Sequence, residues 1–512
     1  MLVKTYGAAI YGINAYQVTV ECNVQPGADY LIVGLPDNSV RESRQRIESA
    51  IQQCGLRFPG RKVVINLAPA DLKKEGSAYD LTMAIGILAG NETVRYERLK
   101  DYVVMGELSL DGTLRPIKGV LPIAIEARRR HFKGIIIPAE NAREAAIVND
   151  LEVYGANHLS DVIKFFNGEK MLERTEFNTR EEFAKNLNQY PFDFADVKGQ
   201  EFTKRALEIA AAGGHNVIMI GPPGGGKSML AKRLPSILPP LSLEESLETT
   251  QIHSVAGKMR PEDALIALRP FRSPHHTISD VALVGGGTNP QPGEISLAHN
   301  GVLFLDELPE FKRSVLEVLR QPMEERRVTI SRARMSTEYP TSFMLVAAMN
   351  PCPCGYYNHP TIDCTCAPGA VNRYLNKVSG PLLDRIDIQI EVIPVPFSKL
   401  AEQKVGESSE QIRERVIAAR QRQMERFKDY KGIHCNAQMT TKLFNTFCVL
   451  DEPSRQRLKL AMERLGLSAR AYDRIVKVAR TIADIEGSDN ITVDHINEAI
   501  TYRSLDRESW GR

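Results

Sequence analysis

The sequence predicts a multidomain α/β protein with a helical C-terminal region, and three features lead to this fold class. Short β-rich runs alternate with helical periodicity over residues 1–165. A strand, a glycine-rich loop and a helix follow one another around residue 220. Residues 396–512 show helical periodicity. With 512 residues the chain is too long for one hydrophobic core, so several domains are expected.

The composition narrows the class of protein. Hydrophobic residues make up 43% of the chain and charged residues 25%, which is ordinary for a globular protein. The net charge of +2 means that contact with nucleic acid must come from local basic patches. The N-terminus does not resemble a signal peptide, and no window resembles a membrane span. The eight cysteines do not form a disulfide scaffold in so long a chain, so we expect a cytoplasmic protein without a membrane partner.

The first domain is expected over residues 1–165. Strands are predicted at 18–20, 31–33, 63–67 and 134–138, and helices at 43–54, 78–88 and 120–130. Residues 166–192 are polar and rich in alternating charges, which predicts an exposed linker.

The glycine-rich loop at residues 221–228 predicts a site for a nucleoside triphosphate. It has the form G-x-x-x-x-G-K-S, follows an apolar run and opens a helix. Backbone N–H groups of such a loop cradle phosphate oxygens, Lys227 is expected to reach the terminal phosphates, and the Ser228 hydroxyl can ligate Mg²⁺. The residues predicted to bind ATP are Gly221, Pro222, Pro223, Gly224, Gly225, Gly226, Lys227 and Ser228.

Two carboxylates at the end of an apolar run predict the second half of this site. Asp306 is expected to hold Mg²⁺ through water, and Glu307 to polarise the attacking water. Between the two motifs lies a glycine- and proline-rich insertion, residues 269–300. Its His275 and His276 have no third metal ligand spaced nearby, so a loop role is expected for them. We assign the ATPase core to residues 193–395 and a helical lid to residues 396–512.

Two basic segments lie downstream. Residues 323–348 predict a hairpin with a basic tip, which carries Arg332 and Arg334 and leads to a buried strand that ends at Asn350. A solvated turn is the alternative reading of the tip. Residues 409–426 predict an arginine-rich helix that could meet nucleic acid, although a solvated helical face is the preferred interpretation.

Four cysteines cluster after Asn350. They form two C-x-C pairs separated by nine residues, and four thiolates at such spacing can close a tetrahedral zinc site. Independent free thiols or a redox pair are the alternatives. The predicted zinc ligands are Cys352, Cys354, Cys364 and Cys366.

The order of phosphate loop, insertion, carboxylates, hairpin, Asn350 and Arg385 resembles AAA+ ATPases of the helix-2-insert group, which holds the magnesium chelatase ATPase subunit and the MCM helicases. The resemblance implies that Asn350 is the sensor that orients the lytic water. It also implies that Arg385 is the finger donated to a neighbour's ATP, which requires a ring.

The same resemblance assigns roles to three more arginines. The hairpin matches the pre-sensor hairpin of MCM proteins, where Arg332 stands at the lysine that touches DNA, with Arg334 close by. Residues 467–472 match the second sensor, which implies that Arg470 contacts the terminal phosphate of the nucleotide.

The first domain resembles the proteolytic domain of the Lon family, through the Gly-Glu-x-x-Leu-x-Gly stretch at 106–112, the helix after it and a strand that ends in proline. That family uses a Ser-Lys dyad. Ala78 and Ile123 stand at the two positions here, so the chemistry of the dyad is absent. Ser77 is one residue away, but no lysine stands at the second position to activate it. We expect this domain to serve assembly or DNA contact.

Taken together, the whole chain is similar to the YifB/ComM family. The resemblance implies a hexameric ATP-driven motor on single-stranded, duplex or branched DNA, which promotes branch migration in homologous recombination and natural transformation. One alternative is a chelatase-type ATPase that remodels a protein or metal-insertion partner. Another is an AAA+ protease, which Ala78 and Ile123 oppose. The residues themselves support the ATPase, the ring and the basic hairpin.

Overall fold

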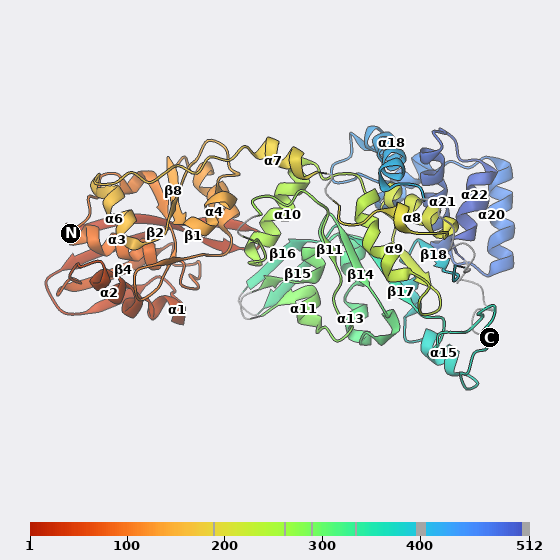
Figure 1. The fold of residues 1–512 in the computed structure, drawn as a ribbon, viewed down its shortest axis with the longest axis horizontal. Helices are drawn as coiled ribbons and strands as arrows, with labels where there is room; N and C mark the ends of the chain where they lie inside the picture. Colours follow the sequence, from red (N-terminus) through yellow and green to blue (C-terminus); the bar gives the residue numbers. More distant parts are fainter. Residues whose placement is uncertain (188–189, 261–262, 288–289, 333–334, 396–405, 504–512) are drawn as a thin grey trace. The chain divides into compact units, whose positions relative to one another are not determined.

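The computed structural model describes residues 1–187, 190–260, 263–287, 290–332, 335–395 and 406–503. The chain divides into two compact units (Figure 1). The first unit holds Met1–Lys185 and Leu243–Ile266, and the second holds Asn186–Ser242 and Ala267–Arg512. Among the described residues, none of the helices has the length and apolarity needed to cross a bilayer.

The first unit is built on a seven-stranded sheet with the strand order β3-β4-β2-β1-β5-β8-β9. β2 pairs antiparallel with β1 and β4, and the other neighbours pair in parallel. A short β6–β7 hairpin lies apart from this sheet. The strands are β1 (Leu2–Tyr11), β2 (Asn14–Gln25), β3 (Tyr30–Val33), β4 (Lys62–Ala68), β5 (Tyr102–Val104), β6 (Glu107–Leu108), β7 (Leu114–Arg115), β8 (Gly134–Pro138) and β9 (Glu152–Ala156).

A largely apolar helix, α3, lies in the core of this unit. Every residue of α3 is buried, and its one charged side chain, Asp80, pairs with Arg46 at 2.6 Å. A Cβ at Gly86 would lie 2.5 Å from the Cys22 sulfur, so glycine lets α3 approach β2 closely. The helices here are α1 (Asn38–Arg41), α2 (Ser43–Gln53), α3 (Asp80–Gly90), α4 (Val120–Arg129), α5 (Ala142–Ala145), α6 (Leu159–Asn167), α7 (Thr179–Asn186, which ends at the boundary of the unit) and α10 (Leu243–Val255).

The boundaries of this unit differ from the predicted ones. The unit extends to Lys185 rather than residue 165, and residues 243–266, predicted within the ATPase core, fold into it. Ser254 of this segment donates a hydrogen bond of 2.5 Å to Glu144, which also accepts one from the N–H of Leu121 at 2.9 Å. Burial raises the pKa of Glu144. A segment of the ATPase sequence therefore completes the packing of the first unit.

The second unit has a five-stranded parallel sheet with the order β11-β14-β17-β10-β18. Its three central strands are buried along their full length, which fits their apolar sequences. The strands are β10 (Val217–Ile220), β11 (Phe271–Arg272), β14 (Val302–Leu305), β17 (Met344–Met349) and β18 (Ile388–Glu391). The helices of this core are α8 (Glu201–Gly213), α9 (Lys227–Arg233), α11 (Asp280–Val284), α12 (Glu294–Leu297), α13 (Arg313–Glu317), α14 (Arg320–Glu325), α15 (Ala370–Leu375) and α16 (Gly380–Leu383).

Two hairpins project from this core, and one is the predicted basic hairpin. β15 (Arg327–Arg332) pairs antiparallel with β16 (Met335–Pro340), which confirms that hairpin. Arg332 is its last described residue before the tip, and Arg334 lies outside the described residues. The hydroxyl of Tyr339 donates to the carbonyl of Pro290 at 2.7 Å, which ties the basic hairpin to the short hairpin of β12 (Gly285–Gly286) and β13 (Gln291–Pro292).

The C-terminal part is helical as predicted, and the arginine-rich helix has an unexpected role. Four of its five arginines, at 413, 415, 420 and 426, contact other parts of the second unit, and only Arg422 is exposed as the solvated face predicted. Arg415 pairs with Glu208 of α8 at 2.5 Å, and Arg420 donates to the Ala212 carbonyl at 3.0 Å. The helix is therefore anchored to the ATPase core. The helices are α18 (Ser409–Phe427), α19 (Thr441–Phe447), α20 (Glu452–Leu465), α21 (Ala469–Ile485) and α22 (Val493–Thr501).

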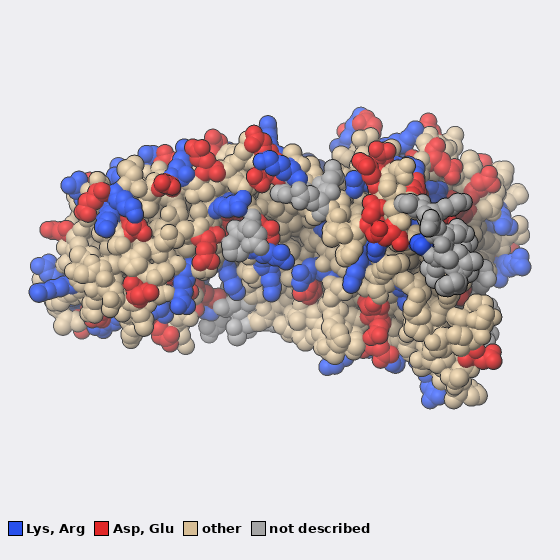
Figure 2. All heavy atoms as spheres, viewed as in Figure 1, with Lys and Arg blue, Asp and Glu red and all other residues tan. Residues whose placement is uncertain are grey.

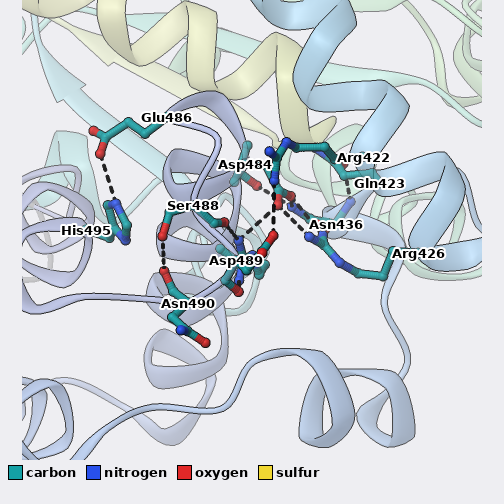
Figure 3. A network of polar contacts seen from close by, with 12 residues as sticks. Arg422, Gln423, Arg426, Asn436, Asp484, Glu486, Ser488, Asp489, Asn490 and His495 are labelled. Carbon is teal, nitrogen blue, oxygen red and sulfur yellow. Dashed lines mark hydrogen bonds and ion pairs between the residues drawn. The ribbon is translucent and has the colours of Figure 1, made fainter.

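A polar network joins the helices of the lid (Figure 3). The buried carboxylate of Asp484 accepts from Arg426 of α18 at 2.8 Å and from Asn436 at 2.8 Å, and it pairs with Arg480 at 3.1 Å. Such a fully bonded carboxylate fixes the relative position of the helices that contribute to it. The network therefore sets the direction of α21, the helix that carries Arg470.

A buried ion pair joins the lid to the sheet. Arg474 of α21 contacts Asp387, which precedes β18, at 2.7 Å. Burial alone would raise the pKa of Asp387, but the guanidinium of Arg474, the His215 ring and the N–H of Asn216 hold this pKa well below its usual range. Asp387 therefore stays ionised in the folded protein.

We expect Asp387→Asn to destabilise the second unit by about 3 kcal/mol, because it leaves Arg474 without its buried partner. Since the folded-state pKa is depressed, the contribution of Asp387 is complete above about pH 4 and is lost as the pH falls toward the folded value. Urea unfolding of both proteins between pH 3 and pH 7 measures this. Equal stability at pH 7 would contradict the assignment; Asp489→Asn, at an exposed pair with Arg422, is the control.

Candidate nucleotide-binding site

The phosphate loop takes its shape from its glycines. It leaves β10 at Gly221, where a Cβ would lie 2.3 Å from the carbonyl oxygen of Val392, so only glycine fits. Gly224 and Gly226 have φ angles of +77° and +89°, which favour glycine. The loop ends at Lys227, where α9 begins. This is the strand, loop and helix that the sequence predicted.

Lys227 is buried at the base of the loop. Its ammonium group donates to the carbonyls of Gly221 at 2.6 Å and Pro222 at 2.9 Å and to the Oδ1 of Asn350 at 3.2 Å. Burial lowers the pKa of Lys227, and the charge of Asp306 opposes this. A cation enclosed by neutral carbonyl and amide oxygens attracts an anion, and phosphate oxygens supply one.

Ser228 and Asp306 contact each other although they follow different strands of the sheet. The Ser228 hydroxyl donates to the Oδ2 of Asp306 at 2.5 Å, although the two residues lie on separate elements. Asp306 directly follows β14, and Asn350 directly follows β17, which lies between β14 and β10. The structure therefore brings together Lys227, Ser228, Asp306 and Asn350, which the sequence analysis placed in one site. A hydroxyl beside a carboxylate is a fitting pair of ligands for Mg²⁺.

Glu307 has a different environment from its neighbour Asp306. Its side chain is 59% exposed, and its backbone adopts φ +52°. The Nδ1 of His276 lies 3.4 Å from the Oε2 of Glu307. The sequence analysis gave His276 only a loop role, because nothing in the spacing showed that the insertion returns to the carboxylates.

The two predicted arginines of the ring site make contacts within their own chain. Arg385 is mostly buried, and it pairs with Glu324 at 2.7 Å and donates to the carbonyl of Pro381 at 2.6 Å. Arg470 is 65% exposed and lies 3.5 Å from Asp384, at the N-terminal end of α21. Glu324 and Asp384 were not predicted as partners, because acidic residues outside a motif carry no signal in the sequence.

The cysteine cluster lies in the segment that follows Asn350. The four sulfur atoms, those of Cys352, Cys354, Cys364 and Cys366, all lie within 4.8 Å of one another. The Cys352 sulfur is 3.2 Å from that of Cys354 and 3.8 Å from that of Cys364. The two C-x-C pairs therefore converge, as a shared metal ion requires.

The Lon-like positions of the first unit carry no dyad. Ile123 is buried within α4, and Ala78 precedes α3. The hydroxyl of Ser77 donates to the carboxylate of Glu107. A serine bonded to a carboxylate in this way is not paired with the lysine that the family's chemistry needs.

Sequence comparison places these features in a family. Family descriptions match three segments: "Magnesium chelatase, subunit ChlI" over residues 193–400, "Subunit ChlI of Mg-chelatase" over 20–141, and "Magnesium chelatase, subunit ChlI C-terminal" over 406–503. The chain is 46% identical to YifB of Salmonella typhimurium, over 99% of this chain and 98% of that protein. It is 44% identical to "Competence protein ComM" of Haemophilus influenzae, over 99% and 98%. The chain belongs to the YifB/ComM family.

Part of the chain is similar to a second kind of protein. Over 162 residues the chain is 32% identical to "Lon protease 2" of Bacillus subtilis, and the matched region covers 29% of this chain and 28% of that protein. This YifB/ComM chain is thus a mixed α/β, magnesium chelatase-like protein of the AAA+ class with a partial likeness to a Lon protein.

We expect His276→Ala to slow ATP hydrolysis and to leave ATP affinity nearly unchanged, because His276 lies beside Glu307, the proposed base. The loss should stay below the roughly 100-fold expected when a general base itself is removed. Steady-state turnover and binding of a fluorescent ATP analogue measure the two effects. His434→Ala is the control, since His434 is an exposed histidine elsewhere in the second unit. An equal loss in both variants would contradict a role for His276.

Proposed function

We propose that this protein is an ATP-hydrolysing hexameric motor that acts on DNA, and that it promotes branch migration during homologous recombination and natural transformation. The observation that carries the ATPase is the convergence of Lys227, Ser228, Asp306 and Asn350 at one edge of the parallel sheet. The near full-length similarity to a protein named "Competence protein ComM" supports the DNA process.

ATP and Mg²⁺ are the proposed cofactors of this site, and Zn²⁺ is the proposed ion of the cysteine cluster. Ser228 and Asp306 would hold Mg²⁺, which neutralises charge on the phosphates when it is bound. Lys227 would exchange its carbonyl partners for phosphate oxygens. Glu307 is exposed to water and would accept the proton of the attacking water, which Asn350 would orient. The products are ADP and phosphate.

The ring is proposed because the site needs an external cation. In this proposal Arg385 donates its guanidinium to the ATP of the neighbouring subunit, and Arg470 contacts the terminal phosphate. The ion pair with Glu324 holds Arg385 within its own chain in this structure. Release of Arg385 from Glu324 would therefore accompany ATP binding between subunits.

Local basic elements support contact with DNA. Figure 2 shows positive and negative side chains interspersed over the visible face, in line with the net charge of +2. Four of the five arginines of α18 are engaged within the second unit, and Arg422 pairs with Asp489 at the surface. The β15–β16 hairpin, to whose tip the sequence analysis assigned Arg332 and Arg334, is therefore the proposed DNA contact, which would act through phosphate charge.

The nucleotide site itself is tested by two substitutions. Lys227→Ala should lose nucleotide binding, because the buried cation for the phosphates is gone. Glu307→Gln should bind ATP and lower its turnover by about 100-fold or more, because an amide cannot accept a proton. Equilibrium binding and single-turnover hydrolysis separate the two effects. Full turnover in Glu307→Gln would contradict its role as the base.

The DNA proposal is tested by ATP turnover with and without a synthetic four-way DNA junction. We expect stimulation in the wild type and its loss in Arg332→Ala/Arg334→Ala, with turnover in the absence of DNA unchanged. Arg327→Ala is the matched control, since this arginine lies on the same hairpin and faces Glu338 at 3.5 Å. A protein that hydrolyses ATP without any response to DNA would argue against the motor.

The family descriptions favour one second candidate, because all three name a magnesium chelatase subunit. A chelatase-type ATPase would remodel a protein or metal-insertion partner. Turnover stimulated by a porphyrin together with a partner subunit, and not by DNA, would support this candidate.

A further inference from the structure

The segment between Asn350 and α15 needs a cross-link to hold its shape. Residues 350–369 are all described, and none of them lies in a helix or strand. An irregular segment of this length has few backbone hydrogen bonds of its own, so its conformation must be fixed by other contacts. It leads from Asn350, which follows β17, to α15. The segment therefore begins at a residue proposed for ATP hydrolysis.

The sulfur positions match a tetrahedral metal site. Zn–S bonds of about 2.3 Å place the sulfurs of a tetrahedron roughly 3.8 Å apart. Here the separations are 3.2 Å for Cys352–Cys354, 3.5 Å for Cys354–Cys364 and 3.8 Å for Cys352–Cys364. The N–H of Tyr357 also donates to the Cys352 sulfur at 3.3 Å. Four thiolates with such spacing select zinc over Mg²⁺ or Ca²⁺.

The same segment packs against the phosphate loop. Gly355 has φ +88°, and a Cβ there would lie 2.6 Å from the Cδ of Pro223, a ring atom that cannot move aside. Gly355 also donates to the carbonyl of Cys352 at 3.0 Å, so its position depends on the cysteine turn. On the other side, Asn350 accepts from Lys227. The cysteine segment therefore contacts the phosphate loop at Pro223 and at Lys227.

We propose that the four cysteines bind one Zn²⁺ and that this ion is a positioning element of the nucleotide site. The metal closes the segment, presses Gly355 onto Pro223 and holds Asn350 beside Lys227. Loss of the ion frees the segment, which weakens nucleotide binding and slows hydrolysis although no cysteine touches the nucleotide. The proposal rests on the proposed function of the phosphate loop as the ATP site.

The first experiment measures zinc content and nucleotide affinity in the same protein. The full-length protein, purified with reductant and without chelator, should hold one zinc per chain. Cys364→Ser should lose most of it, and its Kd for a fluorescent ATP analogue should rise by about tenfold. Cys54→Ser, at a cysteine of the first unit, is the control. Absence of zinc, a disulfide in the cluster, or equal affinity with and without zinc would each overturn the proposal.

The second experiment separates metal binding from its effect on the phosphate loop. Gly355→Ala keeps all four cysteines and should retain zinc, yet its methyl group meets Pro223 and should weaken nucleotide binding. Gly369→Ala is the matched control, because Gly369 has φ +74° with nothing within 4 Å of its Cβ position. Both variants bear a similar backbone strain, so a difference between them isolates the contact. Equal affinities in the two variants would overturn the coupling.

A failure of the ATP site is distinguishable from a failure of this coupling. If the wild type binds no nucleotide, or binds it no better than Lys227→Ala does, the proposed function is wrong. The zinc content of the protein would not change in that case. If the wild type binds nucleotide and its affinity is independent of zinc, only the positioning role is wrong. Circular dichroism of Cys364→Ser confirms that the remainder of the chain is folded.

Discussion

The parallel pairing of β10, β17 and β14 is the constraint on which the nucleotide site depends. The carboxyl ends of parallel strands meet at one edge of a sheet, so residues that follow them come together although the sequence separates them. The register pairs Val217 with Val346 and Leu303 with Leu345. A slip of one residue would turn each side chain to the other face of the sheet. In this pairing Lys227, which follows β10 and the phosphate loop, meets Asn350, which follows β17.

Buried charge then connects the lid to this sheet. Asp387 is 1% exposed and Asp484 is fully buried, and each is paired with arginine. Burying a carboxylate is costly, so such pairs stabilise little overall, but breaking one leaves an uncompensated charge. Their effect is on geometry, since only one arrangement of the helices satisfies every partner (Figure 3). The position of α21, and with it Arg470, follows from these contacts.

The first unit is connected to the second unit through more than one segment of the chain. It has an extensive core of its own, and the resemblance to Lon proteins aligns Ala78 and Ile123 with the two dyad positions. Residues 243–266 lie within the ATPase sequence but fold as part of the first unit, and the chain then continues in the second unit. The chain therefore crosses between the units three times, at Lys185–Asn186, Ser242–Leu243 and Ile266–Ala267. A truncation that removes residues 1–185 would therefore leave residues 243–266 without the unit into which they fold.

The sequence by itself determined the features that local pattern encodes. Most predicted strands and helices of the first unit, the basic hairpin and the phosphate loop are present, because periodicity and glycine placement are local properties. β1 was not predicted, since its alternation is interrupted by Gly7-Ala8-Ala9. The four cysteines were predicted to converge because their spacing is short. Only the tertiary structure decided that residues 243–266 fold into the first unit and that Arg415 of α18 contacts Glu208. It also decided that Arg385 pairs with Glu324 and that His276 lies beside Glu307. These contacts join residues far apart in the chain, and a charge or a histidine in one sequence does not show which distant residue the fold will place beside it.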